Sequence, residues 1–405
     1  MPRLRGVAAT ARKGTWRFVL LLGLVSLCAD ATYEGARSIA GQYLSLLGAS
    51  ATAVGIVAGV GEFLGYGLRL FAGVVADRTG QYWAITLLGY AINVFAVPAL
   101  ALVGHWEVAA ALLLAERFGK AVRTPSRDAL LSYAAPPTGR GIAFGLHEAL
   151  DQLGALLGPL LIAFVLQMGA GYRWGFAVLG LPAVLTMVAL LAAQRHAPEP
   201  YREERGYGLA PRSLSRRFWL YVLFAAAAAV GFPHFVLVAY HVKMQGLLAE
   251  PAIPLAFSIA MATDAVAALL AGSLYDRVKL QLLFLVPALT VCSAAAVVAS
   301  EPLGIWVGIG LWGIVLGIQE SVMRAAIADV APNSWRASAY GVFNAAYGAA
   351  WMLSSSAMGW LYDRGGIDAI MPLVLAGQAA AVVFLAATVA STRRSGTNGL
   401  TRSVS

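Results

Sequence analysis

The sequence contains little charge and almost no cysteine. Only 12% of its 405 residues are Asp, Glu, Lys or Arg, whereas 60% are hydrophobic. A chain this long and this apolar cannot bury its apolar surface in one soluble core, so its composition indicates an integral membrane protein. The two cysteines, Cys28 and Cys292, lie in separate apolar segments and suggest no disulfide framework.

Motifs for nucleotide-driven or hydrolytic chemistry are also missing. There is no glycine-rich loop ending in Lys-Ser or Lys-Thr, and no Gly-x-Ser-x-Gly nucleophile elbow. Two histidines and two methionines, His234, His241, Met244 and Met261, offer groups that suit copper. No cysteine joins them and their spacing fits no closed site, so we expect neither a metal nor a cofactor.

Long apolar runs fill most of the chain. A membrane-spanning helix needs roughly 20 apolar residues, and twelve such segments are predicted. They cover approximately residues 16–47, 51–76, 82–103, 108–131, 142–168, 175–193, 217–245, 252–275, 282–300, 303–328, 339–362 and 369–391. The runs are continuous rather than alternating, which excludes barrel strands. The sequence therefore predicts an all-α membrane protein with twelve transmembrane helices.

The basic residues predict the orientation. With a cytoplasmic N-terminus, the inner loops and tails carry nineteen Lys and Arg residues, and the outer loops carry only Arg173 and Arg364. This asymmetry favours two cytoplasmic termini in the plasma membrane. It also accounts for the net charge of +9 without a nucleic-acid partner.

A polar break at 194–216 separates six predicted spans from six. We expect an N-terminal six-helix bundle at 1–193, a cytoplasmic linker at 194–216, a C-terminal bundle at 217–391 and a tail at 392–405. A single shift of 196 aligns three residues of the first half, Pro136, Arg140 and Gly145, with Pro332, Arg336 and Gly341. This match predicts a parallel repeat of the two halves.

Two loops carry a related charged pattern half a chain apart. The segment GVVADRTG at 73–80 contains Gly73, Asp77 and Arg78, and GSLYDRVK at 272–279 contains Asp276 and Arg277. Both loops fall at cytoplasmic ends of predicted spans. We expect them to form an inner gate in which Asp77 accepts hydrogen bonds from a neighbouring helix N-terminus.

With these motifs the chain resembles the major facilitator superfamily over nearly its full length. The 73–80 loop is similar to the superfamily's signature after the second span. In the fifth predicted span, four residues match the pattern of its antiporters: Gly145, Gly154, Gly158 and Pro159. The resemblance implies two six-helix domains around a cavity that opens alternately to each side, and proton-coupled export. The glycines have a purely structural reading as well, because small residues let helices touch.

Charges inside the predicted spans indicate the mechanism, because each is costly in lipid unless paired or hydrated. Arg117, Lys120, Arg123 and Arg127 form one stripe on the fourth span. Arg117 and Lys120 lie deeper and are predicted to be functional. Arg123 and Arg127 lie nearer the cytoplasm, where the inside bias of basic residues accounts for them, and Pro125 is expected to kink or end this helix.

Carboxylates occur at matching depths. Asp30 is expected level with Arg117, and Asp151 level with Lys120. Glu34 and Arg37 are spaced to pair with each other. We expect Asp30 or Glu34 to take up the coupling proton and Arg117 to respond; the resemblance also gives Arg117 a role in proton coupling. His147, Glu148 and Gln152 extend the polar face of the fifth span.

The C-terminal half is expected to contribute more to substrate binding than to coupling. Together with Gln152, the candidates for contact with a substrate are His234, Asp264, Asn344, Tyr347 and Trp351. The expected function is a monomeric, proton-coupled exporter of a small organic molecule. Two alternatives are an importer of an organic anion, drawn by Arg37, Arg117 and Lys120, and a membrane enzyme using His147, Glu148 and Asp151.

Overall fold

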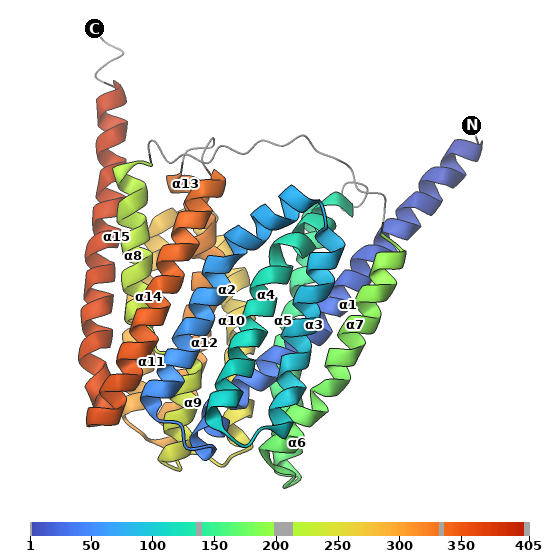
Figure 1. Ribbon diagram of the computed structural model, residues 1–405. Helices are drawn as coiled ribbons and strands as arrows, with labels where there is room; N and C mark the ends of the chain where they lie inside the picture. Colours follow the sequence, from blue (N-terminus) through green and yellow to red (C-terminus); the bar gives the residue numbers. More distant parts are fainter. Residues whose placement is uncertain (1, 135–139, 198–213, 332–335, 401–405) are drawn as a thin grey trace. The chain divides into compact units, whose positions relative to one another are not determined.

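A computed structural model describes residues 2–134, 140–197, 214–331 and 336–400, and every regular element in these ranges is a helix (Figure 1). The first half of the chain contains α1 (Pro2–Leu46), α2 (Ala51–Thr79), α3 (Tyr82–Ala99), η1 (Leu100–Leu102), α4 (Trp106–Ala134), α5 (Arg140–Gln167), α6 (Gly171–Val178) and α7 (Gly180–Arg195). The second half contains α8 (Arg216–Val230), α9 (Phe235–Met244), α10 (Ala252–Val278), η2 (Lys279–Phe284), α11 (Leu285–Val298), α12 (Pro302–Ile318), η3 (Gln319–Met323), α13 (Arg324–Val330), α14 (Arg336–Gly365), η5 (Ile367–Ile370) and α15 (Met371–Leu400).

Nine helical segments within the described ranges are long and apolar enough to cross a membrane. One of them, Ala252–Val298, covers two predicted spans. Helices α4 and α14 are not among the nine; α4 carries the basic stripe, and α14 is rich in Ala, Ser and Gly. The protein is thus a multi-pass helical membrane protein. The number of twelve spans stays a prediction.

Several predicted spans are not single regular helices. The span at 175–193 is divided between α6 and α7, and the span at 303–328 contains the π-helix η3. The span at 217–245 is broken between α8 and α9 at Gly231–His234. Pro233 explains that break, because it has no N–H and disfavours helical backbone at Phe232. Pro125, in contrast, lies inside α4 and does not end it.

Contacts divide the chain into two compact units. Unit 1 comprises Met1–Ala49, Leu64–Gly206 and Ala249–Ser258; unit 2 comprises Ser50–Phe63, Tyr207–Leu248 and Ile259–Ser405. The expected domain boundaries and the parallel repeat stay predictions. Most of the predicted linker and the end of the tail, together with Pro136 and Pro332 of the repeat, lie outside the described residues.

Glycines bring the helices of unit 1 into backbone contact. Gly154 and Gly158 of α5 face α1 so closely that a methyl group at either position would collide with the carbonyl of Leu27 or Ala31. Between α3 and α4, a methyl group at Gly89 would lie 2.7 Å from the backbone nitrogen of Arg123. These contacts hold the segments that carry the buried charges.

The start of α2 belongs to unit 2 and packs on α14. Gly55 faces the backbone of Ser355, and Gly59 faces Met352. At the end of α14, the Asp363 carboxylate accepts hydrogen bonds from the backbone N–H groups of Ala51 at 3.0 Å and Thr52 at 2.8 Å. A carboxylate supplied by one helix therefore caps the N-terminus of another.

Asp363 lies in a third copy of the charged pattern, which our reading of the sequence missed. The segment GWLYDRGG at 359–366 has the same Gly-x-x-x-Asp-Arg-x-Gly spacing as 73–80. All three copies end in left-handed backbone, with φ of 67° at Gly80, 53° at Lys279 and 67° at Gly366. Lys279 thus keeps the turn although it replaces the closing glycine.

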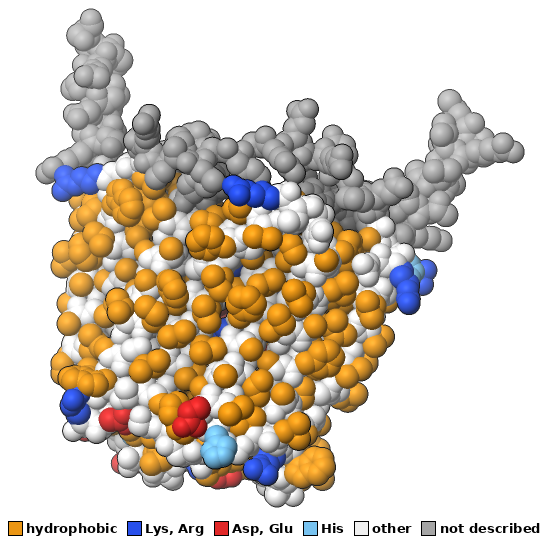
Figure 2. Space-filling model, viewed as in Figure 1, with side chains coloured by type: hydrophobic (Ala, Val, Ile, Leu, Met, Phe, Trp, Pro, Cys, Tyr) orange, Lys and Arg blue, Asp and Glu red, His pale blue; other side chains and the backbone are white. Residues whose placement is uncertain are grey.

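The surface of the protein suits a lipid environment. Hydrophobic side chains cover most of the face shown in Figure 2. Large apolar side chains are exposed on many helices, among them Phe71 (68%), Leu269 (77%) and Val383 (65%). Exposed apolar surface of this extent is expected where lipid replaces water.

The close contact between α1 and α5 yields a test. We expect Gly158→Ala to lower the free energy of unfolding by about 1–3 kcal/mol, because the added methyl overpacks a backbone contact. The measurement is unfolding in detergent micelles. Gly145→Ala is the matched control, since no atom of the described part of the chain lies within 4 Å of its added methyl. Equal stability of the two variants would contradict this packing.

The cap on α2 predicts a pH dependence. Burial raises the pKa of Asp363, but hydrogen bonds from Thr52 and Ala51 outweigh it and lower the pKa below its usual value. The cap therefore stabilises the protein above the unfolded-state pKa of about 3.9, and its contribution is lost as the pH falls through the lower folded-state value. Asp363→Ala should cost about 1 kcal/mol or less at neutral pH, since the carboxylate is exposed, and this cost should shrink as the pH falls through the folded-state pKa. Asp368→Ala, at another exposed carboxylate, should show no such pH-dependent difference.

Candidate functional site

Ionisable side chains gather inside unit 1, where helices α1, α4 and α5 supply them. The basic members are Arg37, Arg117, Lys120, Arg123 and Arg127, and the acidic members are Asp30, Glu34, Glu116, Asp128 and Asp151. We call these residues the charged cluster. It contains as many carboxylates as basic groups, so each charge has a compensating one nearby.

Asp30 and Arg123 form the most deeply buried pair of the cluster. Arg123 Nη2 lies 3.9 Å from Asp30 Oδ1, and the two side chains are only 1% and 5% exposed. This distance is too long for a hydrogen bond. Among the described residues, none forms a hydrogen bond with Asp30 Oδ1. Tyr33 makes a side-chain hydrogen bond to the carboxylate, so charge and one hydrogen bond hold Asp30, and Oδ1 is left able to take up a proton.

The structure corrects the interpretation of Arg123 as an interfacial residue. Its guanidinium carbon lies 4.1 Å from the ring centroid of Tyr90 on α3, and Gly89 gives its helix room to approach. Lys120, one turn earlier on α4, places Nζ 3.8 Å from the ring centroid of Tyr33 on α1. Cation–π contacts of this kind stabilise a desolvated positive charge.

Arg117 pairs with a different carboxylate from the one expected. The sequence placed Arg117 beside Asp30, whereas the structure places its Nε 3.2 Å from Glu116. Glu116 in turn accepts a hydrogen bond from Asn93 of α3 at 2.8 Å. Glu34 and Arg37 are 3.5 Å apart, as their spacing predicts.

A second polar chain joins α1 to α5. The Ser26 hydroxyl donates to the Asp151 carboxylate and lies 3.3 Å from His147 Nε2. Asp151 and Lys120 are both close enough to Asp30 for their charges to act on it. Thus Asp30 and Asp151, which the sequence predicted separately, belong to one electrostatic network. Gln152 is half-buried on the same helix, and Glu148 is exposed.

The other predicted substrate-binding residues belong to unit 2. His234 lies 3.2 Å from Glu62, and the Tyr347 hydroxyl donates to Gln319 at 2.7 Å. Asp264 is buried where α10 meets Gly317 of α12. Trp351 packs edge-on against His234, while Asn344 is half-buried on α14.

The gate loops show two different arrangements. In the first copy Asp77 accepts a hydrogen bond at 2.7 Å from the hydroxyl of Tyr82, the first residue of α3. In the second copy the neighbours of Asp276 and Arg277 contact Asp329. Tyr275 donates a hydrogen bond to Asp329 at 2.8 Å, and Lys279 lies 3.8 Å from it. The role of these loops as a gate stays a prediction.

Several members of the site were missed in the sequence. Glu116, Ser26, Asn93, Tyr33 and Tyr90 escaped notice. Two of them carried a usable signal: Tyr33 lies three residues after Asp30, and Glu116 precedes Arg117 directly. Asn93 and Tyr90 on α3 carried no signal in the sequence, because only the folded structure brings α3 against α4.

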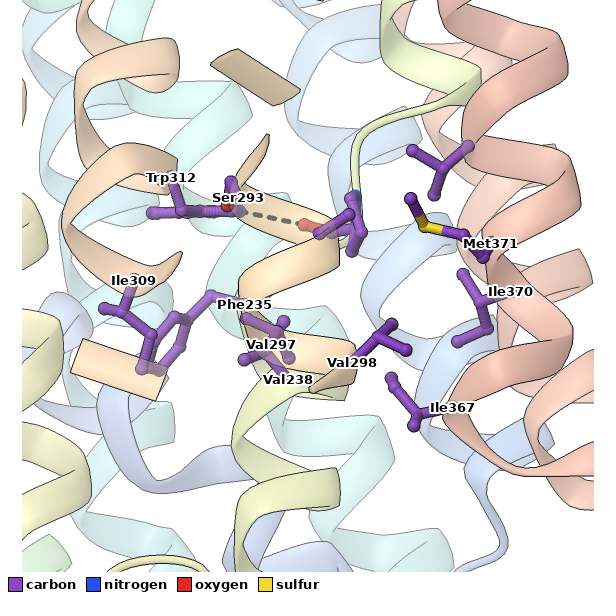
Figure 3. A pocket seen from close by; sticks show the side chains of 13 residues that line it. Phe235, Val238, Ser293, Val297, Val298, Ile309, Trp312, Ile367, Ile370 and Met371 are labelled. Atoms are coloured by element: carbon purple, nitrogen blue, oxygen red, sulfur yellow. Dashed lines mark hydrogen bonds between the residues drawn. The ribbon is translucent and has the colours of Figure 1, made fainter. Parts of the chain in front are cut away.

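A small cavity in unit 2 does not fit a substrate. It has a volume of about 20 Å³ and is lined by apolar residues of α9, α11, α12 and α15, including Phe235, Val297 and Met371 (Figure 3). That volume admits about one water-sized group. Among the described residues, no group of three or more His, Cys, Asp or Glu side chains is placed to hold a metal.

Comparisons with known proteins give a family model, relatives in sequence and a shared fold. The family model described as Major Facilitator Superfamily matches residues 22–355. The uncharacterized protein Rv2265 of Mycobacterium tuberculosis is 43% identical over 91% of this chain and 92% of its own. Multidrug resistance protein MdtH of Edwardsiella ictaluri is 29% identical over 45% of each chain. A crystal structure of nucleoside transporter NupG superimposes with a TM-score of 0.73 at 16% identity, covering 92% of this chain and 98% of that one, which shows a shared fold.

The buried pair predicts a characteristic pattern of stability. Arg123→Met should lower the free energy of unfolding by about 3–5 kcal/mol, because it leaves the Asp30 charge buried without its partner. Adding Asp30→Asn to Arg123→Met should recover part of that loss, which can be measured by unfolding in mixed micelles. Arg78→Met, at an exposed site, is the control and should stay within about 0.5 kcal/mol of the wild type. Strict additivity of the two buried substitutions would argue against a direct interaction.

Proposed function

Since the chain belongs to the major facilitator superfamily, a family of membrane transporters, we propose that it is a secondary transporter that couples the export of a small organic molecule to proton entry. In this proposal twelve spans form two six-helix bundles that alternate between inward and outward access, within a monomer whose termini are both cytoplasmic. The MdtH relatives, named multidrug resistance proteins, support export.

The proposal of proton coupling rests on the burial and the contacts of the Asp30 carboxylate. This carboxylate is 4% exposed and lies 3.9 Å from Arg123 without a hydrogen bond to Oδ1. Protonation of Asp30 would neutralise the carboxylate that pairs with Arg123. Such a change in pairing is a means of favouring one transporter conformation over another, because a proton that binds one state better shifts the population toward it.

Import of an organic anion is less well supported. The alternative relied on Arg37, Arg117 and Lys120 as a positive surface. Arg37 lies beside Glu34, Arg117 beside Glu116, and Lys120 against Tyr33. A cluster in which carboxylates balance the cations has little net attraction for an anion.

Reconstitution tests the proposal directly. Purified protein in liposomes with an imposed pH gradient should drive flux of ligands that first raise its melting temperature in detergent. Asp30→Asn should abolish the pH-driven component, while Glu107→Gln, at an exposed carboxylate at the start of α4, should leave it intact. Full pH-driven flux in both the Asp30→Asn and Glu34→Gln proteins would rule out these carboxylates as the coupling site. Flux in the same direction as protons would identify an importer.

A further inference from the structure

The break between α8 and α9 is held by side chains from three other helices. Such a break frees backbone carbonyls that must find donors inside a membrane. The Trp312 indole of α12 donates to the carbonyl of Pro233 at 2.8 Å, the hydrogen bond drawn in Figure 3. Ser354 of α14 donates to Val230, and Gln378 of α15 donates to Ala228 at 3.0 Å. Side chains of three helices in unit 2 therefore stabilise this break.

His234 occupies the N-cap of α9, and its geometry defines its tautomer. Its Nδ1 accepts a hydrogen bond from the backbone N–H of Val236 at 3.2 Å, so Nδ1 carries no proton. A neutral ring then carries its proton on Nε2, which lies 3.2 Å from the Glu62 carboxylate and donates to it. The two side chains are 2% and 10% exposed. A buried carboxylate thus accepts from an imidazole whose other nitrogen caps a helix.

We propose that Glu62 and His234 form a second proton-binding site of this transporter, in which loading the proton uncaps α9. The inference rests on the proposed proton-coupled function and adds a site outside the charged cluster. The proton comes from water and binds the Nδ1 lone pair in place of the hydrogen bond from Val236, giving an imidazolium beside the Glu62 carboxylate. Since Nδ1 then carries a hydrogen, it no longer accepts from Val236, and the first turn of α9 loses its cap.

The residues around His234 leave room for a proton but not for a larger ligand. The edge-on contact with Trp351 places the ring centroids 5.3 Å apart, and Trp351 in turn packs on Phe232. The cavity that Pro233 and Phe235 line beside His234 holds only about 20 Å³.

Few other groups on the packed elements change charge near neutral pH. The remaining titratable residues that unit 2 carries on these elements are Arg216, Arg217 and Tyr221 on α8, Tyr240, His241 and Lys243 on α9, and Arg336, Tyr340, Tyr347, Tyr362, Asp363 and Arg364 on α14. Of these types, only histidine ordinarily titrates between pH 5 and 8. His241 contacts Tyr362 at 3.0 Å and is the natural control.

The test uses the substrate-free protein in detergent and follows tryptophan fluorescence against pH, because an imidazolium against Trp351 quenches its emission. We expect a transition whose amplitude is lost in His234→Asn, which keeps a capping side chain. The same loss is expected in Trp351→Phe. Glu62→Gln should move the midpoint down by about one pH unit or more, because the carboxylate favours the imidazolium. His241→Gln should preserve the transition.

A transition that persists in His234→Asn, or its absence from the wild type between pH ~5 and ~9 where histidine titrates, would overturn the second site. No substrate or gradient enters this measurement. Loss of pH-driven flux in liposomes with the transition intact would therefore count against the proposed function alone, and the reverse result against the second site alone.

Discussion

The cost of a buried charge governs the interior of this protein. In a medium without water, an ionised side chain persists only where an opposite charge, an aromatic face or a hydrogen bond compensates it. Unit 1 uses all three: Asp30 with Arg123, Lys120 with Tyr33, and Asp151 with Ser26. Each contact joins two different helices. The arrangement of α1, α3, α4 and α5 and the charge state of the site therefore depend on each other.

Small residues make this pairing possible. Arg123 reaches Asp30 because Gly89 lets α4 approach α3, and Asp30 itself lies on a stretch of α1 that Gly154 and Gly158 hold against α5. Of the antiporter-like glycines, Gly154 and Gly158 therefore act at least through helix packing. Packing and chemistry are not separate explanations here, since the glycines determine which carboxylates come near which cations.

Sequence reasoning could predict much of the fold and only part of the site. Hydrophobic runs indicated the membrane class, and the spacing of Glu34 and Arg37 predicted a pair within one helix, because both signals are local. The partners of Asp30 and Arg117 depended on the rotation of α4 against α1 and α3, which a depth estimate along one helix does not contain. Arg123 was misjudged for this reason. Glu62 escaped notice because its partner, His234, lies 172 positions away.

The positive-φ residue that closes the charged pattern affects how this pattern should be interpreted in a membrane-protein sequence. Gly80, Lys279 and Gly366 all have a positive φ, yet the aspartate before each of them has a different environment. Asp77 accepts from a tyrosine five residues on, Asp276 is flanked by residues that bind Asp329, and Asp363 caps a helix 312 positions earlier. The pattern thus marks where a long helix ends, and in the second copy a lysine occupies the closing position. Counting its occurrences in a sequence counts helix endings, and only the partner of each aspartate tells what that ending does.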